Sequence, residues 1–243
     1  MSKSYKVQYF GSEGRENLSL VIKAIKLFIN TTLNQGFAAP TKIVFLTREG
    51  EGPMLAHSLL QSLGVKIIAV TFPRHYFAKQ PDNSIFMPEI SEKIRRFFQA
   101  FDIPIITNRL PFDDIEGANA HNREMSLIRD ALALFGGSIP LAIQAVLQAT
   151  DAGYVNIGEQ VIAAAGDCAL VVTASTTRLF LRKDHFGLAV NEIICKPRSL
   201  TITRKTATPQ LAGPNRSLGQ IDSNPIVEGQ QADEDKTAQK NLE

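Results

Sequence analysis

Short apolar runs alternate with longer segments of helical periodicity along most of this chain. Residues 42–47 and 65–72 are compact apolar runs with the length of buried strands. Between them, apolar residues recur at three- and four-residue steps and stop at Gly64, a residue type that commonly ends a helix. A strand, a helix and a second strand in this order are typical of a parallel sheet with crossover helices. The pattern therefore predicts an α/β fold.

The alternation continues to about residue 198. The helix predicted over 139–152 carries no charge apart from Asp151, so we expect it to be largely buried. Only Gly166 and Asp167 join the strands predicted over 159–165 and 168–174, which favours at least one antiparallel pairing. Further strands are predicted over 5–10, 103–107 and 189–195, and further helices over 18–29, 54–63, 90–101 and 123–135.

A change of composition divides the chain near residue 204. Of the 243 residues, 44% are hydrophobic and 21% are charged, which suits a globular protein with one sizeable core. The last 40 residues contain no aromatic side chain and only ten apolar ones. So few apolar residues cannot offset the entropy lost when a segment of this length becomes ordered. We therefore predict one domain over 1–203 and a disordered tail over 204–243.

The charge balance and the start of the chain exclude several classes of protein. The formal net charge is only +2, so the broad basic surface of a nucleic-acid-binding protein is missing. No apolar run approaches the roughly 20 residues that span a bilayer, and the first residues lead into a strand pattern. We therefore expect a cytoplasmic protein that binds neither nucleic acid nor membrane, with Cys168 and Cys195 reduced.

The turn between the first predicted strand and the first predicted helix is the strongest candidate for a binding site. It consists of Gly14, Arg15, Glu16 and Asn17. A chain that turns from a strand into a helix leaves free N–H groups and the positive end of a helix dipole, which suit an anionic or polar ligand. Arg15 and Asn17 are candidate ligand contacts. Glu16 either faces a ligand or only improves the interaction with the helix dipole.

Further segments supply candidate residues for the same pocket, because ligands gather at the carboxyl ends of strands in open α/β sheets. The turn after the second predicted strand is rich in glycine, which either admits a ligand to the backbone or serves only the turn. The next strand ends in a threonine, and the apolar helix ends in a carboxylate. The residues assigned in this way are Thr47, Arg48, Gly50, Gly52, Thr71, Asp151 and Gly153.

Asp151 has the least expected position of the candidate carboxylates, because an acidic side chain at the C-terminus of a helix opposes the helix dipole. Either Asp151 bonds backbone amides in the turn through Gly153, or it faces the pocket as a hydrogen-bond acceptor. The four histidines are isolated along the chain and no Cys-x-x-Cys pair occurs, so we predict no metal site.

Several motifs follow one another in an order that is found in a known family. They are the turn at 14–17, the turn at 47–52, Met87-Pro88-Glu89, Gly136-Gly137, Asp151-Ala152-Gly153 and the closing segment 192–198. Together they resemble the stand-alone proteins built on the C-terminal α/β domain of pyruvate kinase, over roughly residues 5–198. The resemblance implies a three-layer sandwich: a mostly parallel sheet with helices on both faces and an antiparallel edge strand. In pyruvate kinase this domain is regulatory, binds phosphorylated ligands and carries no catalytic residue.

Two carboxylates would repel the phosphorylated ligand that the resemblance implies. Glu49 and Glu51 lie in the second candidate turn. Two like charges near 4 Å repel by about 4 kcal/mol at an effective dielectric of 20. A helix N-terminus contributes only about 1 kcal/mol in the opposite direction. A phosphate at this turn therefore needs compensation from Arg15 or Arg48.

Three hypotheses about function stay open. We favour a small-molecule-binding protein with a regulatory role, whose ligand is a phosphorylated molecule, a nucleotide or a flavin. The Gly166-Asp167 connection is shorter than the glycine-rich connection of the family, which weakens the expectation of a flavin. The alternatives are an enzyme with Glu16 or Asp151 as its acid–base group, and a homo-oligomeric assembly module. The sequence assigns no catalytic residue.

Overall fold

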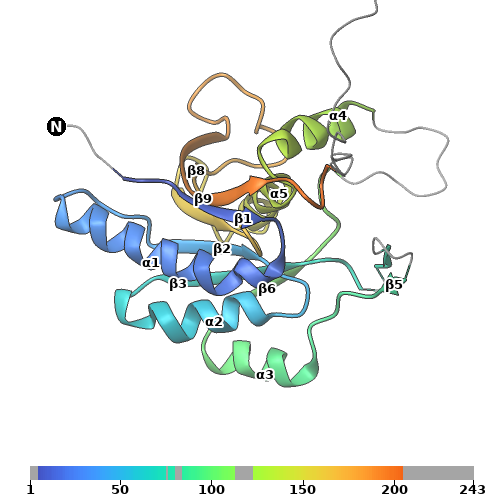
Figure 1. The fold of residues 1–243 in the computed structure, drawn as a ribbon, viewed down its shortest axis with the longest axis horizontal. Helices are drawn as coiled ribbons and strands as arrows, with labels where there is room; N and C mark the ends of the chain where they lie inside the picture. Colours follow the sequence, from blue (N-terminus) through green and yellow to red (C-terminus); the bar gives the residue numbers. More distant parts are fainter. Residues whose placement is uncertain (1–4, 75, 80–83, 113–122, 205–243) are drawn as a thin grey trace, which may run out of the picture. The chain divides into compact units, whose positions relative to one another are not determined.

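A computed structural model of the protein describes residues 5–74, 76–79, 84–112 and 123–204. Within these residues, seven strands form one sheet in the order β1-β9-β8-β7-β2-β3-β6 (Figure 1). The strands are β1 (Gln8–Ser12), β2 (Lys42–Leu46), β3 (Lys66–Thr71), β6 (Ile105–Thr107), β7 (Gln160–Ala164), β8 (Ala169–Thr173) and β9 (Ala189–Ser199). The short strands β4 (Ala78–Lys79) and β5 (Ile85–Phe86) form a separate antiparallel pair.

Six of the seven strands run in one direction. β2 is parallel to β3 and to β7, β3 is parallel to β6, and β1 is parallel to β9. β8 is antiparallel to both of its neighbours, β7 and β9. We call the end of the sheet where the six parallel strands finish its carboxyl end, and the opposite end its amino end.

The predicted α/β class and the mostly parallel sheet are confirmed. The predicted antiparallel strand is β8, which lies two strands in from the outer strand β1. Its position follows from the short Gly166-Asp167 link, which places β8 beside β7, and from β9, which returns on the far side of β8. β1, from the start of the chain, then adds to the outside of β9.

Helices cover both faces of the sheet, as a three-layer sandwich requires. The helices are α1 (Leu18–Asn34), α2 (Glu51–Leu60), α3 (Glu92–Ala100), α4 (Arg123–Leu132) and α5 (Ser138–Asp151). α1, α2 and α3 pack on one face, and α4 and α5 on the other. Within β2, Ile43 and Phe45 contact the first group, while Val44 and Leu46 contact the second. Burial on both faces explains why this strand is an unbroken apolar run.

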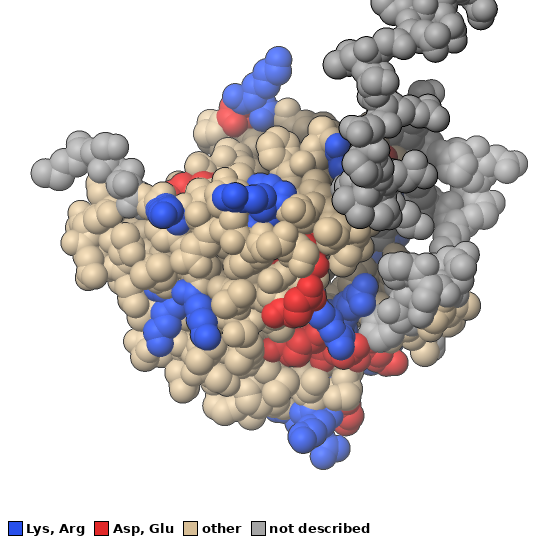
Figure 2. All heavy atoms as spheres, viewed as in Figure 1, with Lys and Arg blue, Asp and Glu red and all other residues tan. Residues whose placement is uncertain are grey.

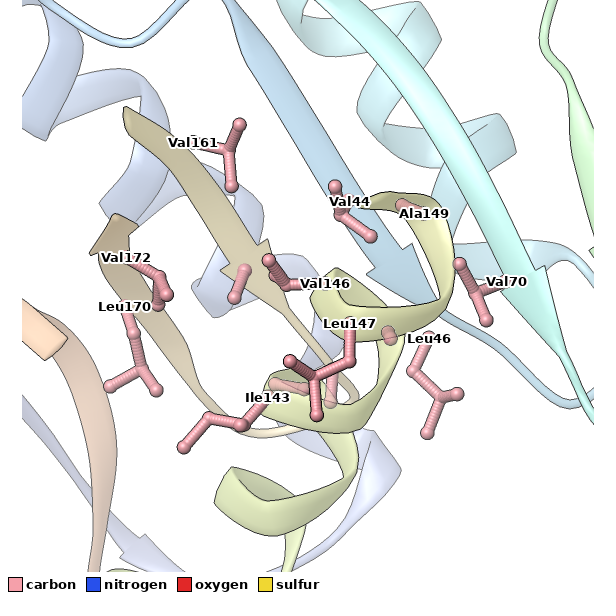
Figure 3. Packing of buried hydrophobic residues seen from close by; sticks show 14 of the residues in the cluster. Val44, Leu46, Val70, Ile143, Val146, Leu147, Ala149, Val161, Leu170 and Val172 are labelled. Atoms are coloured by element: carbon pink, nitrogen blue, oxygen red, sulfur yellow. The ribbon is translucent and has the colours of Figure 1, made fainter. Parts of the chain in front are cut away.

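α5 is the buried helix that the sequence predicts. Eleven of its fourteen residues are buried. Ile143, Val146 and Leu147 pack against side chains from β2, β3, β7 and β8, as Figure 3 shows. The helix also buries Gln144, whose side-chain oxygen accepts a hydrogen bond from the Phe112 N–H (2.6 Å) and whose amide donates to the Pro140 carbonyl (3.1 Å). These bonds satisfy a polar side chain inside an apolar layer.

The boundaries of several elements differ from the predicted ones. β1 begins at Gln8 where a strand was expected from residue 5, α1 continues to Asn34, and β9 continues to Ser199. Short 3-10 helices over Arg15–Asn17, Gln61–Leu63 and Ala133–Phe135 precede or extend α1, α2 and α4. The described residues belong to one compact unit, and the predicted tail, apart from Arg204, lies outside them. Within the described residues, no helix combines the length and apolar character needed to cross a bilayer.

Candidate functional site

The turn after β1 leads directly into α1 at the carboxyl end of the sheet. Gly14 has a φ angle of 140°, and a Cβ atom on it would lie 2.1 Å from a carboxylate oxygen of Glu16. Asn17 is buried, and its amide donates to the carbonyls of Ser12 (2.8 Å) and Gly14 (3.1 Å). Asn17 was predicted as a ligand contact, but both of its N–H groups are used to close the turn. Arg15 and Glu16 remain exposed at this position.

The second candidate turn joins β2 to α2. The Thr47 hydroxyl is buried and accepts a hydrogen bond from the Gly50 N–H (2.9 Å). Gly50 has a φ angle of 97°, and an added Cβ would lie 2.6 Å from the Ile94 side chain of α3. An added Cβ on Gly52 would lie 2.4 Å from the Phe45 ring. Backbone conformation accounts for Gly50, and close packing accounts for both glycines. Of the two interpretations left open by the sequence, the structure therefore favours glycines that serve only the turn.

These two turns lie together, as the sequence predicts. A guanidinium nitrogen of Arg15 is 4.0 Å from a carboxylate oxygen of Glu49, and both side chains are largely exposed. The Thr71 hydroxyl donates to the Arg48 carbonyl (3.5 Å), which connects the end of β3 to the same turn. A Cβ on Gly166 would be 3.5 Å from the Arg15 Cα, so the β7–β8 hairpin packs against the first turn. Segments from four strands thus meet at the carboxyl end.

Asp151 and Gly153 do not belong to this group, and their assignment to the pocket is wrong. α5 begins beside the turn after β1 and runs back along the sheet, so that its last residue lies about 21 Å away at the amino end. Asp151 is exposed and accepts hydrogen bonds from the N–H (3.1 Å) and the hydroxyl of Thr177. It is therefore held in a surface turn, and the hypothesis of Asp151 as an acid–base group loses its support.

Glu13 is a central residue of the carboxyl end that sequence reasoning missed. It is 4% exposed. Its carboxylate accepts hydrogen bonds from the N–H groups of Gly137 (3.0 Å), Ile202 (2.7 Å) and Thr203 (2.8 Å), and from the Thr203 hydroxyl. Burial by itself raises the pKa of Glu13, but the four hydrogen bonds outweigh it and lower the pKa below its ordinary value. Glu13 thus joins the end of β1 to the start of α5 and to the segment after β9.

Asp167 is the second missed carboxylate, and it is 3% exposed. Its Oδ2 accepts a hydrogen bond from the Gly14 N–H (2.9 Å), and the Ser138 side chain also bonds to the carboxylate. Its Oδ1 is buried and has no hydrogen-bond partner among the described residues. Burial raises the pKa of Asp167, and the nearby charges of Glu13 and Glu16 raise it further. The sequence signal was an acidic residue in a two-residue link between buried strands.

Carboxylates outnumber guanidinium groups in the turns after β1 and β2 and in the β7–β8 hairpin. Five carboxylates (Glu13, Glu16, Glu49, Glu51 and Asp167) lie there with the two guanidinium groups of Arg15 and Arg48. In Figure 2, acidic side chains gather on the side of the view where β1 ends and α1 begins. Glu13 also accepts the hydrogen bond of the Gly137 N–H at the start of α5, and Asp167 accepts that of the Gly14 N–H. Two backbone N–H groups that could otherwise bind a phosphate are therefore already bonded to carboxylates of the protein.

Two hollows lie away from this end of the sheet. One of about 530 Å³ lies at the amino end and is lined by Lys42, Lys66, Gly153 and Tyr154, among others. Lys42 is already engaged there, with its ammonium group 2.9 Å from a Glu159 oxygen and 3.0 Å from the Tyr154 carbonyl. The other, of about 640 Å³, lies beside β1 and α1. Among the described residues, no three His, Cys, Asp or Glu side chains are grouped to hold a metal ion.

Comparisons with known proteins leave the family open. No family model matches the chain, and no curated protein matches it in sequence. The resemblance to the C-terminal domain of pyruvate kinase therefore stays a prediction.

Proposed function

We propose that the protein binds a small polar molecule at the carboxyl end of its sheet and serves a regulatory role. The observation that carries the proposal is the free oxygen of Asp167, buried where the turn after β1 meets the β7–β8 hairpin. A buried carboxylate oxygen without a donor is costly, and a ligand that brings an N–H or O–H group would remove the cost. The exposed residue Arg15 directly follows Gly14, whose N–H bonds the other oxygen of Asp167.

The chemistry of these groups favours a ligand with two different parts. Asp167 and Glu16 accept hydrogen bonds, which suits hydroxyl, amino or ring N–H groups. Arg15 and Arg48 suit a phosphate, because guanidinium groups bind its oxygens in pairs. A nucleotide, a flavin mononucleotide or a sugar phosphate carries both parts. The N–H groups of Gly14 and Gly137 already donate to carboxylates of the protein. We therefore expect the phosphate to bind the two arginines and not these backbone groups.

Matched pairs of compounds with and without a phosphate test this proposal. Calorimetric titrations would compare riboflavin with its mononucleotide, adenosine with its nucleotides, and sugars with their phosphates. We expect at least one phosphorylated member to bind, and Arg15→Ala to reduce its advantage over its unphosphorylated partner. Arg178→Ala removes an exposed arginine near the amino end and is the control. Equal binding of both members of every pair, or no effect of Arg15→Ala, would contradict the proposal.

A second candidate function is acid–base catalysis on the same ligand, with Asp167 in the role first considered for Glu16 or Asp151. Its raised pKa is the specific observation in favour, because a general acid or base works best near the ambient pH. Carbon-13 NMR of the Asp167 carboxyl group would measure this pKa directly. A value at or below the ordinary 3.8 of an aspartate would remove the hypothesis.

A further inference from the structure

β1 forms an outer edge of the sheet. It pairs with β9 on one side and has no described strand on the other. Along such an edge, the N–H and C=O groups of every second residue point outward and can bond an added strand. The opposite edge strand, β6, has only three residues and follows Pro104, so it offers a shorter template. β1 is therefore the better edge for the addition of a strand.

The hollow of about 640 Å³ lies at the start of this edge. It is lined by residues 5–9, by Leu27 and Thr31 of α1, and by Arg198 of β9. Leu27 and Tyr9 are each 51% exposed, and they give the hollow two large apolar surfaces. Of the five consecutive residues that line the groove, residues 5–7 precede β1, and Gln8 and Tyr9 are its first two residues. The groove thus offers an apolar surface where an added strand would begin to pair with β1.

The charged residues that line the groove are both basic. Lys6 and Arg198 are the charged residues of its lining. Lys23 and Lys26 are the charged residues of α1, and both are exposed. Arg198 is held over the Tyr9 ring, with its guanidinium carbon 5.3 Å from the ring centre. Figure 2 shows several basic side chains on this face of the molecule, with smaller acidic groups among them. An acidic partner would complement this surface.

A second copy of the chain suits this edge poorly. In a symmetric pair centred on the groove, Lys6 and Arg198 of both copies would lie along one interface, and like charges repel. Lysine at an edge strand is also a known protection against such pairing, and Lys6 lies two residues before β1. Such protection does not explain a hollow with exposed apolar side chains beside the strand.

We infer that the groove between β1 and α1 binds an extended, acidic peptide segment of a partner protein, which adds to the sheet as a strand beside β1. The backbone of β1 would supply the hydrogen bonds. Leu27 and Tyr9 would contact apolar side chains of the segment, and Lys6 and Arg198 its carboxylates. This site is separate from the ligand site proposed at the carboxyl end.

Fluorescence anisotropy with labelled synthetic peptides and the full chain tests this inference. The probes are seven-residue peptides in which glutamate alternates with valine, isoleucine, threonine or tyrosine. Control peptides carry lysine in place of glutamate, or N-methyl groups that block one backbone edge. The variant Lys6→Glu/Arg198→Glu reverses the charge of the groove, and Arg178→Glu/Lys183→Glu makes the same change at exposed positions elsewhere. Circular dichroism melts verify that both double variants fold.

We expect at least one acidic peptide to bind, and the groove variant to weaken it at least tenfold while the control variant changes it less than twofold. Hydrogen exchange of the amides in residues 8–12 should slow in the complex. Failure of every acidic peptide to bind would overturn the inference, as would equal binding of the N-methylated peptide, which would indicate charge attraction alone. Light scattering that shows a dimer sensitive to the groove variant would assign the edge to a second copy and also overturn it.

Discussion

The carboxylate of Asp167 accepts a hydrogen bond from the backbone N–H of Gly14, 153 residues earlier in the chain. The bond joins the β7–β8 hairpin to the turn between β1 and α1, although β9 and β8 separate β1 from β7 in the sheet. It fixes the turn that carries Arg15 relative to the buried carboxylate. This contact therefore helps to position the proposed ligand site, together with the bonds of Asn17 and Glu13 in the same segment.

Replacement of Glu13 by glutamine should destabilise the protein. Both carboxylate oxygens of Glu13 accept hydrogen bonds, and a glutamine would face two of the four donors with its own N–H groups. Buried donors without an acceptor cost about 1–3 kcal/mol each. We expect a loss of about 3 kcal/mol in the free energy of unfolding and a melting temperature lower by about 6–12 °C. Urea and thermal denaturation measure both quantities.

The effect of Glu13→Gln should also depend on pH. The folded-state pKa of Glu13 lies below its ordinary value of 4.5, so its contribution is complete above that pH. The contribution is lost as pH falls through the folded-state pKa, because the protonated group accepts fewer hydrogen bonds. The difference between the variant and the wild type should therefore shrink in acid. Glu16→Gln changes an exposed carboxylate of the same turn and should have an effect within about 0.5 kcal/mol at any pH.

Replacement of Asp167 by asparagine should have the opposite pH dependence. The pKa of Asp167 is raised in the folded protein because of burial and the charges of Glu13 and Glu16. The wild type therefore loses stability as pH rises through the folded-state pKa, whereas the neutral asparagine does not. Relative to the wild type, the variant should gain stability from pH 3.5 to pH 7 in thermal melts. A constant difference over this range would contradict the raised pKa.

Replacement of Gly50 by alanine should disturb the start of α2. Gly50 has a φ angle of 97°, where a side chain costs about 1–2 kcal/mol, and an added Cβ would also press on Ile94. We expect a melting temperature lower by about 3–8 °C. In the double variant Gly50→Ala/Ile94→Ala the clash with Ile94 is removed. Its stability relative to Ile94→Ala alone therefore measures the cost of the backbone conformation. Gly11→Ala adds a Cβ with no atom within 4 Å and should change stability by about 0.5 kcal/mol or less.

Replacement of Leu147 by alanine should be the most damaging single change in α5. Its side chain is fully buried against the sheet, and removal of a buried leucine costs about 2–5 kcal/mol. Leu33→Ala, in which the same groups are removed from a side chain that is 52% exposed, should cost about 0.5 kcal/mol or less. Similar losses for the two variants in urea denaturation would contradict the position of α5 between the layers.

The fold could be predicted because its local signals agree with one another. Residues such as Val44 and Phe45 are buried on opposite faces of β2, and the resulting unbroken apolar run is typical of a central parallel strand. Gly64 ends the segment after α2 in a left-handed conformation, as its place in the pattern indicated. The short Gly166-Asp167 link indicated that β8 pairs with β7, but the place of β9 on the far side of β8 could not be predicted, because it depends on how the strands assemble in the folded sheet.

The candidate site could be predicted only in part. Arg15 and Thr47 follow parallel strands, so their turns meet at the same end of the sheet. Asp151 ends a helix that leads into a parallel strand, and such a helix ends at the amino end. This rule of chain direction by itself excludes Asp151 from a pocket at the carboxyl end. Glu13 was missed because its importance comes from long-range hydrogen bonds, which leave no local pattern in the sequence. Asp167 did leave a local signal, its place in the short link between two buried strands, but its bond to Gly14 arises only in the folded chain.

The most direct test of the proposed ligand site is an NMR titration of the nitrogen-15-labelled protein with the nucleotide, flavin and sugar phosphate pairs. We predict that the compound that binds shifts the amide signals of residues 13–17, 47–51 and 165–167, and that its unphosphorylated partner shifts them less. Shifts confined to the amino end around Lys42, Lys66 and Tyr154, or no shift with any compound, would contradict the account.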